Sequence, residues 1–501
     1  MRHYFCQAFA AVCCVLLSGT PTRAFIITPS DPDPWLQTAS GPRPAGNGSP
    51  ATITWSIIPD GTTAIRDTNS SATAPSNLIS FMNTNFGGNA GQTDLTLQPW
   101  FHIFTDAFGR WSQLSGANFV FEPHDDGAQH PGTNNNGILG VRGDIRFGGA
   151  NVDGAGNVLA FTYLPTGGSD MMIDTSESTF FKNSNSNFIN FRNTLTHEVG
   201  HAFGLQHVST TSALLMEPVI DTTFDGPQLD EVRAIQFYFG DANEKSNGGL
   251  GNANAALATA LGAIAANSTK SVGAAANVPD QAISASSTDF VSISRLSDAD
   301  YYSFTVSGSS LLTATLVPRG GVFSQGSQGQ VPTTFNANAR NNLSLTVVGS
   351  DGTTDLASAS AQPAGGTESI SNLLLPAAGQ YFVRVSGATD TVQLYQLSLT
   401  PSPILLGDYN QDGRVDGGDY VVWRNSQGQS IAQGSGADGS FDGQINAADY
   451  AVWRSHFGQT LDGGSGDGLT GTASAAPEPA AIWLVVFGAT TISGGWLRRK
   501  R

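Results

Sequence analysis

Short apolar runs, separated by Gly, Asp, Asn and Ser, recur along most of the chain. The alternation in ATITWSI from Ala51 predicts a strand, and the runs ANFVFEP, GDIRFGG and NVLAFTYLP predict three more. Two segments instead have apolar residues at helical spacing, PWFHIFTDAFGRWSQLSG from Pro99 and LDEVRAIQFYFG, the second closed by Gly240. These patterns predict a mixed α/β domain over residues 51–242.

A different pattern follows, in which strand-like runs alternate with Gly, Asp and Ser turns over residues 280–400. The runs DYYSFTV, LLTATLVP, LSLTVVG, QYFVRVSG and VQLYQLSLT are typical of an all-β sandwich. Residues 25–50, rich in Pro, Gly and Asp, predict a linker. The Ala/Gly/Asn-rich residues 243–279 are either a second linker or the irregular start of the sandwich.

Residues 405–460 contain one pattern twice, as DYNQDGRVDGGDYVVWR and DGSFDGQINAADYAVWR. Each copy has oxygen-bearing residues and a sixth-position glycine at the spacing of a twelve-residue calcium loop. One such loop could be a solvated turn, but two in register, each leading into a helix, favour Ca²⁺ binding. The expected ligands are Asp408, Asn410, Asp412, Arg414, Asp416 and Asp419 in the first loop, and Asp438, Ser440, Asp442, Gln444, Asn446 and Asp449 in the second.

The net charge and the two ends of the chain narrow the expected location and function. There are 40 acidic and 23 basic residues, a net charge of -17, which argues against nucleic-acid binding through basic patches. Residues 1–24 read as a secretory signal peptide that contains all 3 cysteines, so we expect an extracellular chain without disulfides. After a Gly/Ser-rich linker over 461–476, the apolar run within 477–501 ends in RRKR and predicts a transmembrane helix, with a buried core helix as the alternative.

The stretch HEVGHAFGLQH gathers three of the 8 histidines. On a helix, His197 and His201 lie on one face about 6 Å apart along the axis, which suits two ligands of one metal ion. A left-handed Gly204 would end the helix and bring His207 back as a third ligand. Three nitrogens with an open fourth position are typical of catalytic Zn²⁺, and Glu198 is placed to reach a water on that ion.

With Met216 nine residues further on, this pattern resembles the metzincin metallopeptidases. The segments ITWSI, FTDAFGRWSQLSGANFVFEP, GDIRFGG, SALLMEPV and LDEVRAIQFYFG make residues 51–240 most similar to matrixins. The resemblance implies that Glu198 is the general base, that Gly204, Met216 and Pro218 are structural, and that the segment after Met216 walls the S1′ pocket.

The chain differs from the matrixin pattern at several positions. Phe161 and Met172 stand where matrixins carry histidines for a structural zinc, so we expect that zinc to be absent. The carboxylates of Asp153, Asp174 and Glu177 are candidates for the family's calcium site, or are solvated loop groups. Val208 replaces the usual serine after the third histidine, and the connection to Met216 is one residue longer.

Three other segments resemble known modules. DADYYSFTV and LPAAGQYFVRVSG are similar to bacterial pre-peptidase C-terminal domains, although a β-sandwich of another family has the same pattern. The calcium repeat resembles dockerin type I, which implies a cohesin-like partner, but Gly417-Gly418 and Ala447-Ala448 occupy the usual recognition positions. The end from Pro477-Glu478-Pro479 resembles a PEP-CTERM signal, which implies sorting by an exosortase-type enzyme.

Together these features predict a multidomain chain: an α/β (α+β) metzincin catalytic domain, an all-β sandwich, a small α EF-hand-like or dockerin-like repeat and a C-terminal transmembrane helix. The expected function is zinc-dependent endopeptidase activity on protein or peptide substrates at the outer surface or in the extracellular matrix. A non-catalytic extracellular matrix or surface binding protein with a degenerate protease domain is the alternative, and hydrolysis of a non-peptide amide is a second. The expected partners include a cohesin-like domain or an extracellular polysaccharide. The intact Glu198 favours the enzyme.

Overall fold

The computed structural model describes residues 5–9, 25, 35–44, 46–66, 72–131, 137–165 and 168–460. The chain forms two compact units, Met1–Pro403 and Ile404–Arg501. Apart from the backbone of β1 (Phe5–Phe9), the predicted signal peptide lies outside the described residues, as do the linker over 461–476 and the C-terminal segment 477–501. Among the residues that are described, no helix is long and apolar enough to span a bilayer.

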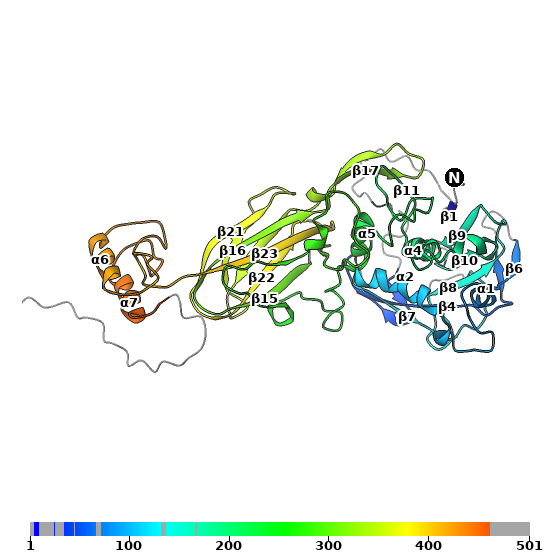
Figure 1. Cartoon of the computed structure of the whole chain (residues 1–501), viewed down its shortest axis with the longest axis horizontal. Helices are drawn as coiled ribbons and strands as arrows, with labels where there is room; N and C mark the ends of the chain where they lie inside the picture. Colours follow the sequence, from blue (N-terminus) through cyan, green and yellow to red (C-terminus); the bar gives the residue numbers. More distant parts are fainter. Residues whose placement is uncertain are drawn as a thin grey trace, which may run out of the picture. The chain divides into compact units, whose positions relative to one another are not determined.

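A six-stranded sheet with the order β1-β9-β10-β8-β4-β7 is the centre of the N-terminal domain (Figure 1). Its other strands are β4 (Ala51–Ile57), β7 (Ala117–Phe121), β8 (Ile145–Ala150), β9 (Val158–Tyr163) and β10 (Met171–Asp174). β4, β7, β8 and β10 are parallel, whereas β9 is antiparallel to β10. The strands expected from the alternating runs therefore share one sheet, and β9 has the reversed direction.

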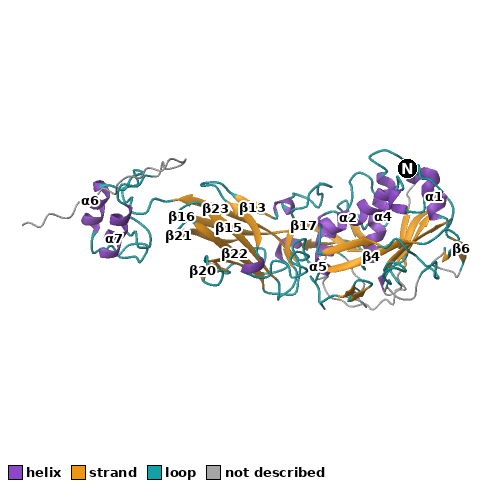
Figure 2. Ribbon diagram, turned by 90° about the horizontal axis from the view of Figure 1, so that it is seen from below, coloured by secondary structure: helices purple, strands orange, loops and turns teal. Residues whose placement is uncertain are grey.

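Helices α2 (Phe101–Gln113) and α4 (Ile189–Ala202) lie side by side against this sheet (Figure 2). Aromatic residues of α2 stack on Trp55 of β4, with ring centroids 4.9 Å apart for Phe108 and 5.6 Å for Phe101. Trp111 of α2 donates from Nε1 to the carbonyl of Thr196 in α4, at 3.1 Å. The apolar stripe of α2 thus holds the histidine helix in place. The remaining helices of the domain are α1 (Leu78–Asn85), α3 (Ser178–Phe181) and α5 (Leu229–Phe239).

The described part of residues 25–50 is packed against the domain, which differs from the predicted linker. Trp35 and Ser49 are buried, and the Arg43 guanidinium donates to the carbonyls of Trp35, Ser49 and Tyr238. The Pro- and Gly-rich composition does not predict this packing, because single residues such as Trp35 and Arg43 supply the contacts with the domain. In this region β2 (Gln37–Thr38) pairs with β3 (Gly41–Pro42). Further along the chain, β5 (Thr63–Ile65) pairs with β6 (Thr73–Pro75).

A β-sandwich completes the first unit. One sheet has the order β12-β15-β22-β19-β20, and the other has β13-β23-β16-β21, with β14 also paired to β23. Residues 243–279 start this module, since β12 and β13 belong to its two sheets. The strands are β12 (Thr259–Ala263), β13 (Lys270–Val272), β14 (Val291–Ile293), β15 (Ala299–Val306), β16 (Ser310–Arg319), β19 (Leu343–Val348), β20 (Asp355–Ala359), β21 (Glu368–Leu375), β22 (Gly379–Gly387) and β23 (Gln393–Pro403).

Two features join the sandwich to the N-terminal domain. The apolar core of the domain continues into Ile283, Phe290, Val392 and Leu394. A hairpin of β17 (Val322–Ser327) and β18 (Thr333–Asn336) leaves the sandwich and pairs with β11 (Val208–Thr210), the strand that follows His207. This hairpin is not predicted by the sequence pattern.

Within residues 404–460, the described part of the second unit, lie two helices, α6 (Gly417–Ser426) and α7 (Ala447–His456), each preceded by a loop. Trp423 donates from Nε1 to the carbonyl of Asn446, and Trp453 donates to the carbonyl of Asp416, both at 2.8 Å. Each helix is therefore bonded to the loop of the other repeat. The predicted pair of loops, each running into a Tyr/Trp helix, matches this arrangement.

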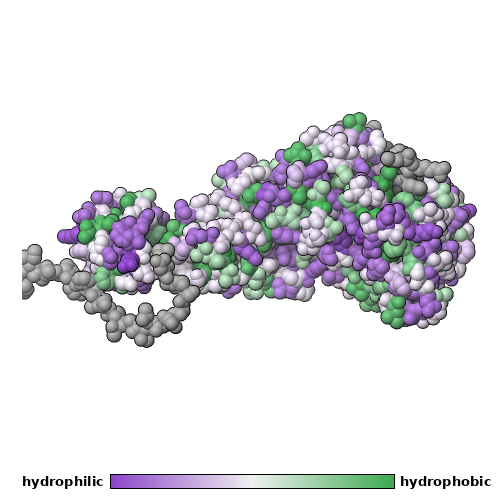
Figure 3. Space-filling view, viewed as in Figure 1, coloured by the Kyte–Doolittle hydropathy of each residue, from purple (hydrophilic) through white to green (hydrophobic). Residues whose placement is uncertain are grey.

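Hydrophobic residues on the face shown in Figure 3 lie in small groups among hydrophilic ones. This distribution agrees with the burial of the large aromatic side chains, of which Trp35, Trp55, Trp100 and Trp111 are each at most 1% exposed. The described cores therefore enclose these large aromatic side chains.

Candidate active site

Helix α4 carries His197 and His201 on one face, four residues apart. It ends at Ala202, and Gly204 adopts a φ of +100°, which reverses the chain as the sequence predicted. A Cβ at Gly204 would lie 2.9 Å from the Tyr238 hydroxyl, so both space and backbone require glycine. The turn returns His207 to the other two histidines, and all three are buried.

The three Nε2 atoms converge on one point. They are 3.0 Å apart for His197 and His201, 3.1 Å for His201 and His207, and 3.2 Å for His197 and His207. A tetrahedral ion with bonds of ~2.0–2.1 Å would separate its nitrogens by about 3.3 Å. The triangle is therefore close to the size that one zinc ion requires.

The outer nitrogens of the rings fix their orientation. His197 Nδ1 lies 2.6 Å from the Leu215 carbonyl, and His201 Nδ1 lies 2.6 Å from the Leu205 carbonyl. A carbonyl only accepts, so each Nδ1 carries the hydrogen and each Nε2 presents its lone pair. Burial lowers the pKa of His197 to about 3 and that of His207 to about 4, and it lowers the pKa of His201 well below its ordinary value. Three neutral imidazoles with converging lone pairs fit Zn²⁺.

Glu198 is fully buried beside the histidines. The Thr162 hydroxyl, on β9, donates to Glu198 Oε2 at 2.7 Å. The sequence analysis did not single out Thr162, which is 36 residues away in the chain and has no motif of its own. The bond links Glu198 of α4 to β9.

Met216 packs against α4 at Gly200, where a Cβ would lie 2.6 Å from the methionine Sδ. The Met216 amide donates to Glu231 Oε1 at 3.1 Å, and the Met216 carbonyl accepts from Val208 at 3.0 Å. Gly200, inside the motif, is thus the residue that permits the close approach of the methionine. Pro218 is only partly buried in the segment that follows.

The three carboxylates proposed for a calcium site in this domain lie around one loop. Asp174 accepts from Ser176 N at 2.8 Å, and Glu177 accepts from the amides of Gly156 and Asn157. Burial, followed by the charge of Asp174, raises the pKa of Asp153. These carboxylates already bind backbone amides, and calcium at this loop stays a prediction.

Phe161 and Met172, at the positions matching the second matrixin zinc, are cross-strand partners in β9 and β10. Both are buried in an apolar cluster with Ile58, Ala64 and Ala150. Neither side chain offers a nitrogen ligand, and both pack against apolar neighbours.

The two loops of the repeat share the hydrogen bonds of their first and twelfth residues. At position 1, Asp408 accepts from the amides of Asp412 and Gly413, as Asp438 does from Asp442 and Gly443. At position 12, Asp419 and Asp449 each accept from the residues at positions 3 and 9. The sixth-position glycines have φ values of +84° and +79°. The carboxylates at positions 1 and 12 of each loop thus bond the backbone of their own loop, and calcium binding by the predicted ligands stays a prediction.

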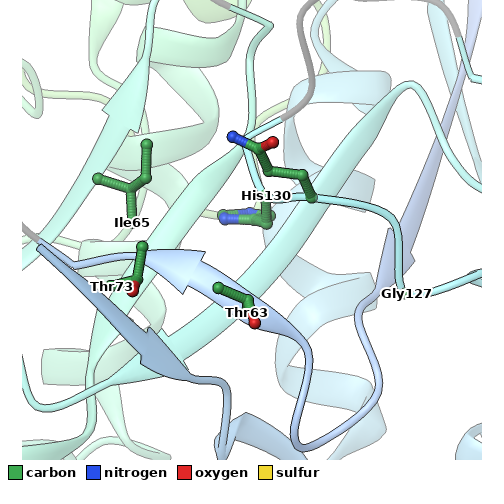
Figure 4. Close-up of a pocket in the computed structure, with 6 residues that line it drawn as sticks. Thr63, Ile65, Thr73, Gly127 and His130 are labelled. Atoms are coloured by element: carbon green, nitrogen blue, oxygen red, sulfur yellow. The ribbon is translucent and has the colours of Figure 1, made fainter. Parts of the chain in front are cut away.

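Two further polar features lie away from the histidines. A pocket of about 460 Å³ is lined by Thr63, Ile65, Thr73, Gly127, Gln129 and His130 (Figure 4). The carboxylates of Glu244, Asp298 and Asp300, all buried, come within 4.8 Å of one another. Sequence reasoning missed this carboxylate cluster because its members are spread over more than fifty residues.

Comparisons with known proteins agree with this domain order. Residues 89–240 match the matrixin family model, residues 298–387 match the bacterial pre-peptidase C-terminal domain, and residues 406–457 match the dockerin type I domain.

Individual relatives cover parts of the chain. Metalloendoproteinase 2-MMP of Arabidopsis thaliana is 29% identical over 154 residues, which is 29% of this chain and 38% of the plant protein. The crystal structure of the pre-peptidase C-terminal domain of a Bacillus anthracis collagenase is 14% identical and covers 28% of this chain and 94% of that structure, with a TM-score of 0.17. The chain therefore contains a matrixin domain, a bacterial pre-peptidase C-terminal domain and a dockerin type I domain, in that order.

Proposed function

We propose that this protein is a zinc-dependent endopeptidase that hydrolyses peptide bonds outside the cell. The observation that carries the proposal is the triangle of three Nε2 atoms, with sides of 3.0–3.2 Å, next to the buried Glu198 in a segment that matches matrixins. The residues that would hold the zinc are His197, His201 and His207.

Zinc bound by three histidines supplies a Lewis acid that polarises a carbonyl and lowers the pKa of a water molecule. In the proposed reaction, the Glu198 carboxylate takes a proton from the attacking water and passes it to the leaving amine. Thr162 holds the carboxylate in place through its bond to Oε2. Burial of Glu198 excludes bulk water from this proton transfer.

An extended substrate would add to the outer edge of β9 as an antiparallel strand. β9 is flanked by β10 on one side, and its other edge pairs with the backbone of β1, so this edge accepts a further strand. Cleavage near residue 24 would remove β1 and leave the edge to substrate. The segment after Met216, including Pro218, would wall the S1′ pocket.

The remaining segments would determine where the enzyme is located. The proposal includes secretion through residues 1–24 and sorting at residues 477–501 by an exosortase-type enzyme. The repeat would bind two Ca²⁺ ions and a cohesin-like domain or an extracellular polysaccharide. The match to dockerin type I over residues 406–457 supports this role of the repeat.

The first test compares the secreted chain with Glu198→Gln and His201→Ala. Glu198→Gln should keep one zinc in the peptidase domain and lower kcat on a peptide library by on the order of 10²–10⁴, because general-base catalysis contributes that factor. His201→Ala should lose both zinc and cleavage. Zinc by elemental analysis and cleavage by mass spectrometry would check this, and full cleavage by Glu198→Gln would refute the mechanism.

A further inference from the structure

The strand that follows the third histidine is bound by the sandwich. β17 and β11 are neighbours in Figure 1 and pair antiparallel. In this pairing Val208 lies opposite Ser327 and Thr210 opposite Gln325. Thr210 Oγ1 also donates to the Ser324 carbonyl at 2.9 Å. The three-stranded sheet β11-β17-β18 therefore contains strands from both domains.

The hairpin is fixed on the other side by α5. Phe335 of β18 lies under the guanidinium of Arg233, whose Cζ is 5.1 Å from the ring centroid. Arg233 is itself buried and paired with Asp230 at 2.7 Å. A desolvated cation over an aromatic ring stabilises the contact. Strand pairing and this contact together hold the hairpin at the site.

The Nδ1 atom of His207 is hydrogen-bonded to a residue of another domain, unlike the Nδ1 atoms of His197 and His201. His197 and His201 use backbone carbonyls of their own domain, whereas His207 Nδ1 lies 3.1 Å from Oε1 of Gln328. Gln328 follows β17 at the tip of the hairpin, 121 residues away in the chain. A carbonyl oxygen at this place keeps the hydrogen on Nδ1 and leaves Nε2 for the metal.

The backbone on both sides of Gln328 is pinned. Ser327 belongs to the ladder with β11, and the Gly329 amide donates to Ser209 Oγ at 3.1 Å. A turn closes between the Gln330 amide and the Ser327 carbonyl at 2.9 Å, with Gly329 at a φ of +76°. Because the backbone is fixed, the exposed Gln328 side chain loses only its own rotamer freedom when it binds His207.

We propose that Gln328 of the sandwich is a positioning residue for the metal ligand His207, so that the pre-peptidase C-terminal domain completes the zinc site. The inference rests on the proposed function in so far as His207 binds zinc. It assigns the sandwich a role in the metal centre beyond that of a spacer. A fragment that ends near residue 245 would lack this partner.

Zinc affinity in the whole secreted chain tests the inference. Gln328→Ala should weaken zinc binding by about 10- to 100-fold, the usual effect of losing an outer partner of a histidine ligand. It should also alter the visible absorption of the Co²⁺-substituted protein. Gln328→Glu keeps an acceptor oxygen and should bind zinc at least as tightly as the wild type. Gln330→Ala, in the same turn, is the matched control and should leave both readouts unchanged.

The outcomes separate this inference from the proposed function. Zinc affinity and a cobalt spectrum in Gln328→Ala within twofold of the wild type would overturn the positioning role, even if the enzyme cleaves peptides. Equal weakening by Gln328→Ala and Gln328→Glu would also overturn it. A zinc-binding wild type that cleaves no peptide, with Gln328→Ala still weakened, would overturn only the endopeptidase, and a wild type without zinc would overturn both.

Discussion

Glu198 and Thr162 show how a single contact connects the helix with the strand beside it. The carboxylate is fully buried, and the Thr162 hydroxyl reaches it from β9 at 2.7 Å. A hydrogen bond to a charged group is worth about 1.5–3 kcal/mol. The bond both stabilises the buried charge and fixes the direction of the carboxylate.

Replacement of Thr162 by valine should therefore reduce catalysis. Valine keeps the branched shape and the strand preference but removes the hydroxyl, so we expect kcat to fall roughly tenfold or more, with KM and zinc content unchanged. Steady-state kinetics on one peptide substrate would measure the effect. Thr162→Ser, which keeps the hydroxyl, should retain most of the activity; equal losses in both variants would instead indicate a packing defect.

The motif predicts the histidines well because helix geometry and one glycine determine their positions. His197 and His201 share a face by their spacing, and Gly204 makes the turn that returns His207. The same reasoning could not find Thr162 or Gln328, which lie 36 and 121 residues from the groups they contact. Such partners depend on strand register and on packing between domains, and local sequence encodes neither.

The repeated loop and helix form an element that is symmetric in its hydrogen bonds as well as in its sequence. The indole of each tryptophan donates to the carbonyl at position 9 of the other loop, Asn446 for Trp423 and Asp416 for Trp453. A change in one loop therefore disturbs the helix that packs on it. The first loop gathers four aspartates, Asp408, Asp412, Asp416 and Asp419, whose mutual repulsion a cation would remove.

Removal of calcium should unfold this unit while the rest of the chain stays folded. Calorimetry of the whole chain should show one transition that moves to lower temperature in EGTA and returns with Ca²⁺, because a ligand bound only by the folded state stabilises it. Asp419→Ala and Asp449→Ala should each reduce the bound calcium by one ion. A transition that responds to neither reagent would contradict calcium binding.

The sequence predicts strands and helices whose hydrophobic residues recur with a clear period, but it does not predict which elements they pair with. NVLAFTYLP and LDEVRAIQFYFG form β9 and α5 as expected. The hairpin β17–β18 lies in GVFSQGSQGQVPTTFNA, where Gly, Ser and Gln mask the alternation. Its order comes from pairing with β11 and from Phe335, contacts that become visible only in three dimensions.

At the scale of the first unit, four buried carboxylates lie where the N-terminal domain meets the sandwich. Asp241 and Glu244 follow α5, Asp298 precedes β15, and Asp300 lies within it. Asp241 accepts from the amides of Asn243 and Ser292, and Asp300 accepts from the Tyr395 hydroxyl at 2.5 Å. Burial raises the pKa of Asp241 to about 7, and burial, followed by the charge of Asp298, raises that of Glu244 to about 9.

Raised carboxyl pKa values mean that the folded chain holds protons which the unfolded chain has already released. The stability they provide is complete below the ordinary carboxyl range near pH 4 and is lost as the pH rises towards 9. We therefore expect the free energy of unfolding of this unit, in buffer without divalent cations, to fall from pH 7 to pH 9. Below this range the lowered pKa values of His197, His201 and His207 act in the opposite direction. The slope approaches about 1.4 kcal/mol per pH unit for each proton by which the two states differ.

Glu244→Gln removes one of these ionisations and should make the slope shallower. At pH 9 the variant should lose less stability relative to its own value at pH 7 than the wild type does, since the amide has no proton to release. Urea unfolding followed by near-ultraviolet circular dichroism at several pH values would measure both slopes. A wild-type stability that stays constant or rises between pH 7 and 9 would show that the four carboxylates do not remain protonated where the two domains meet.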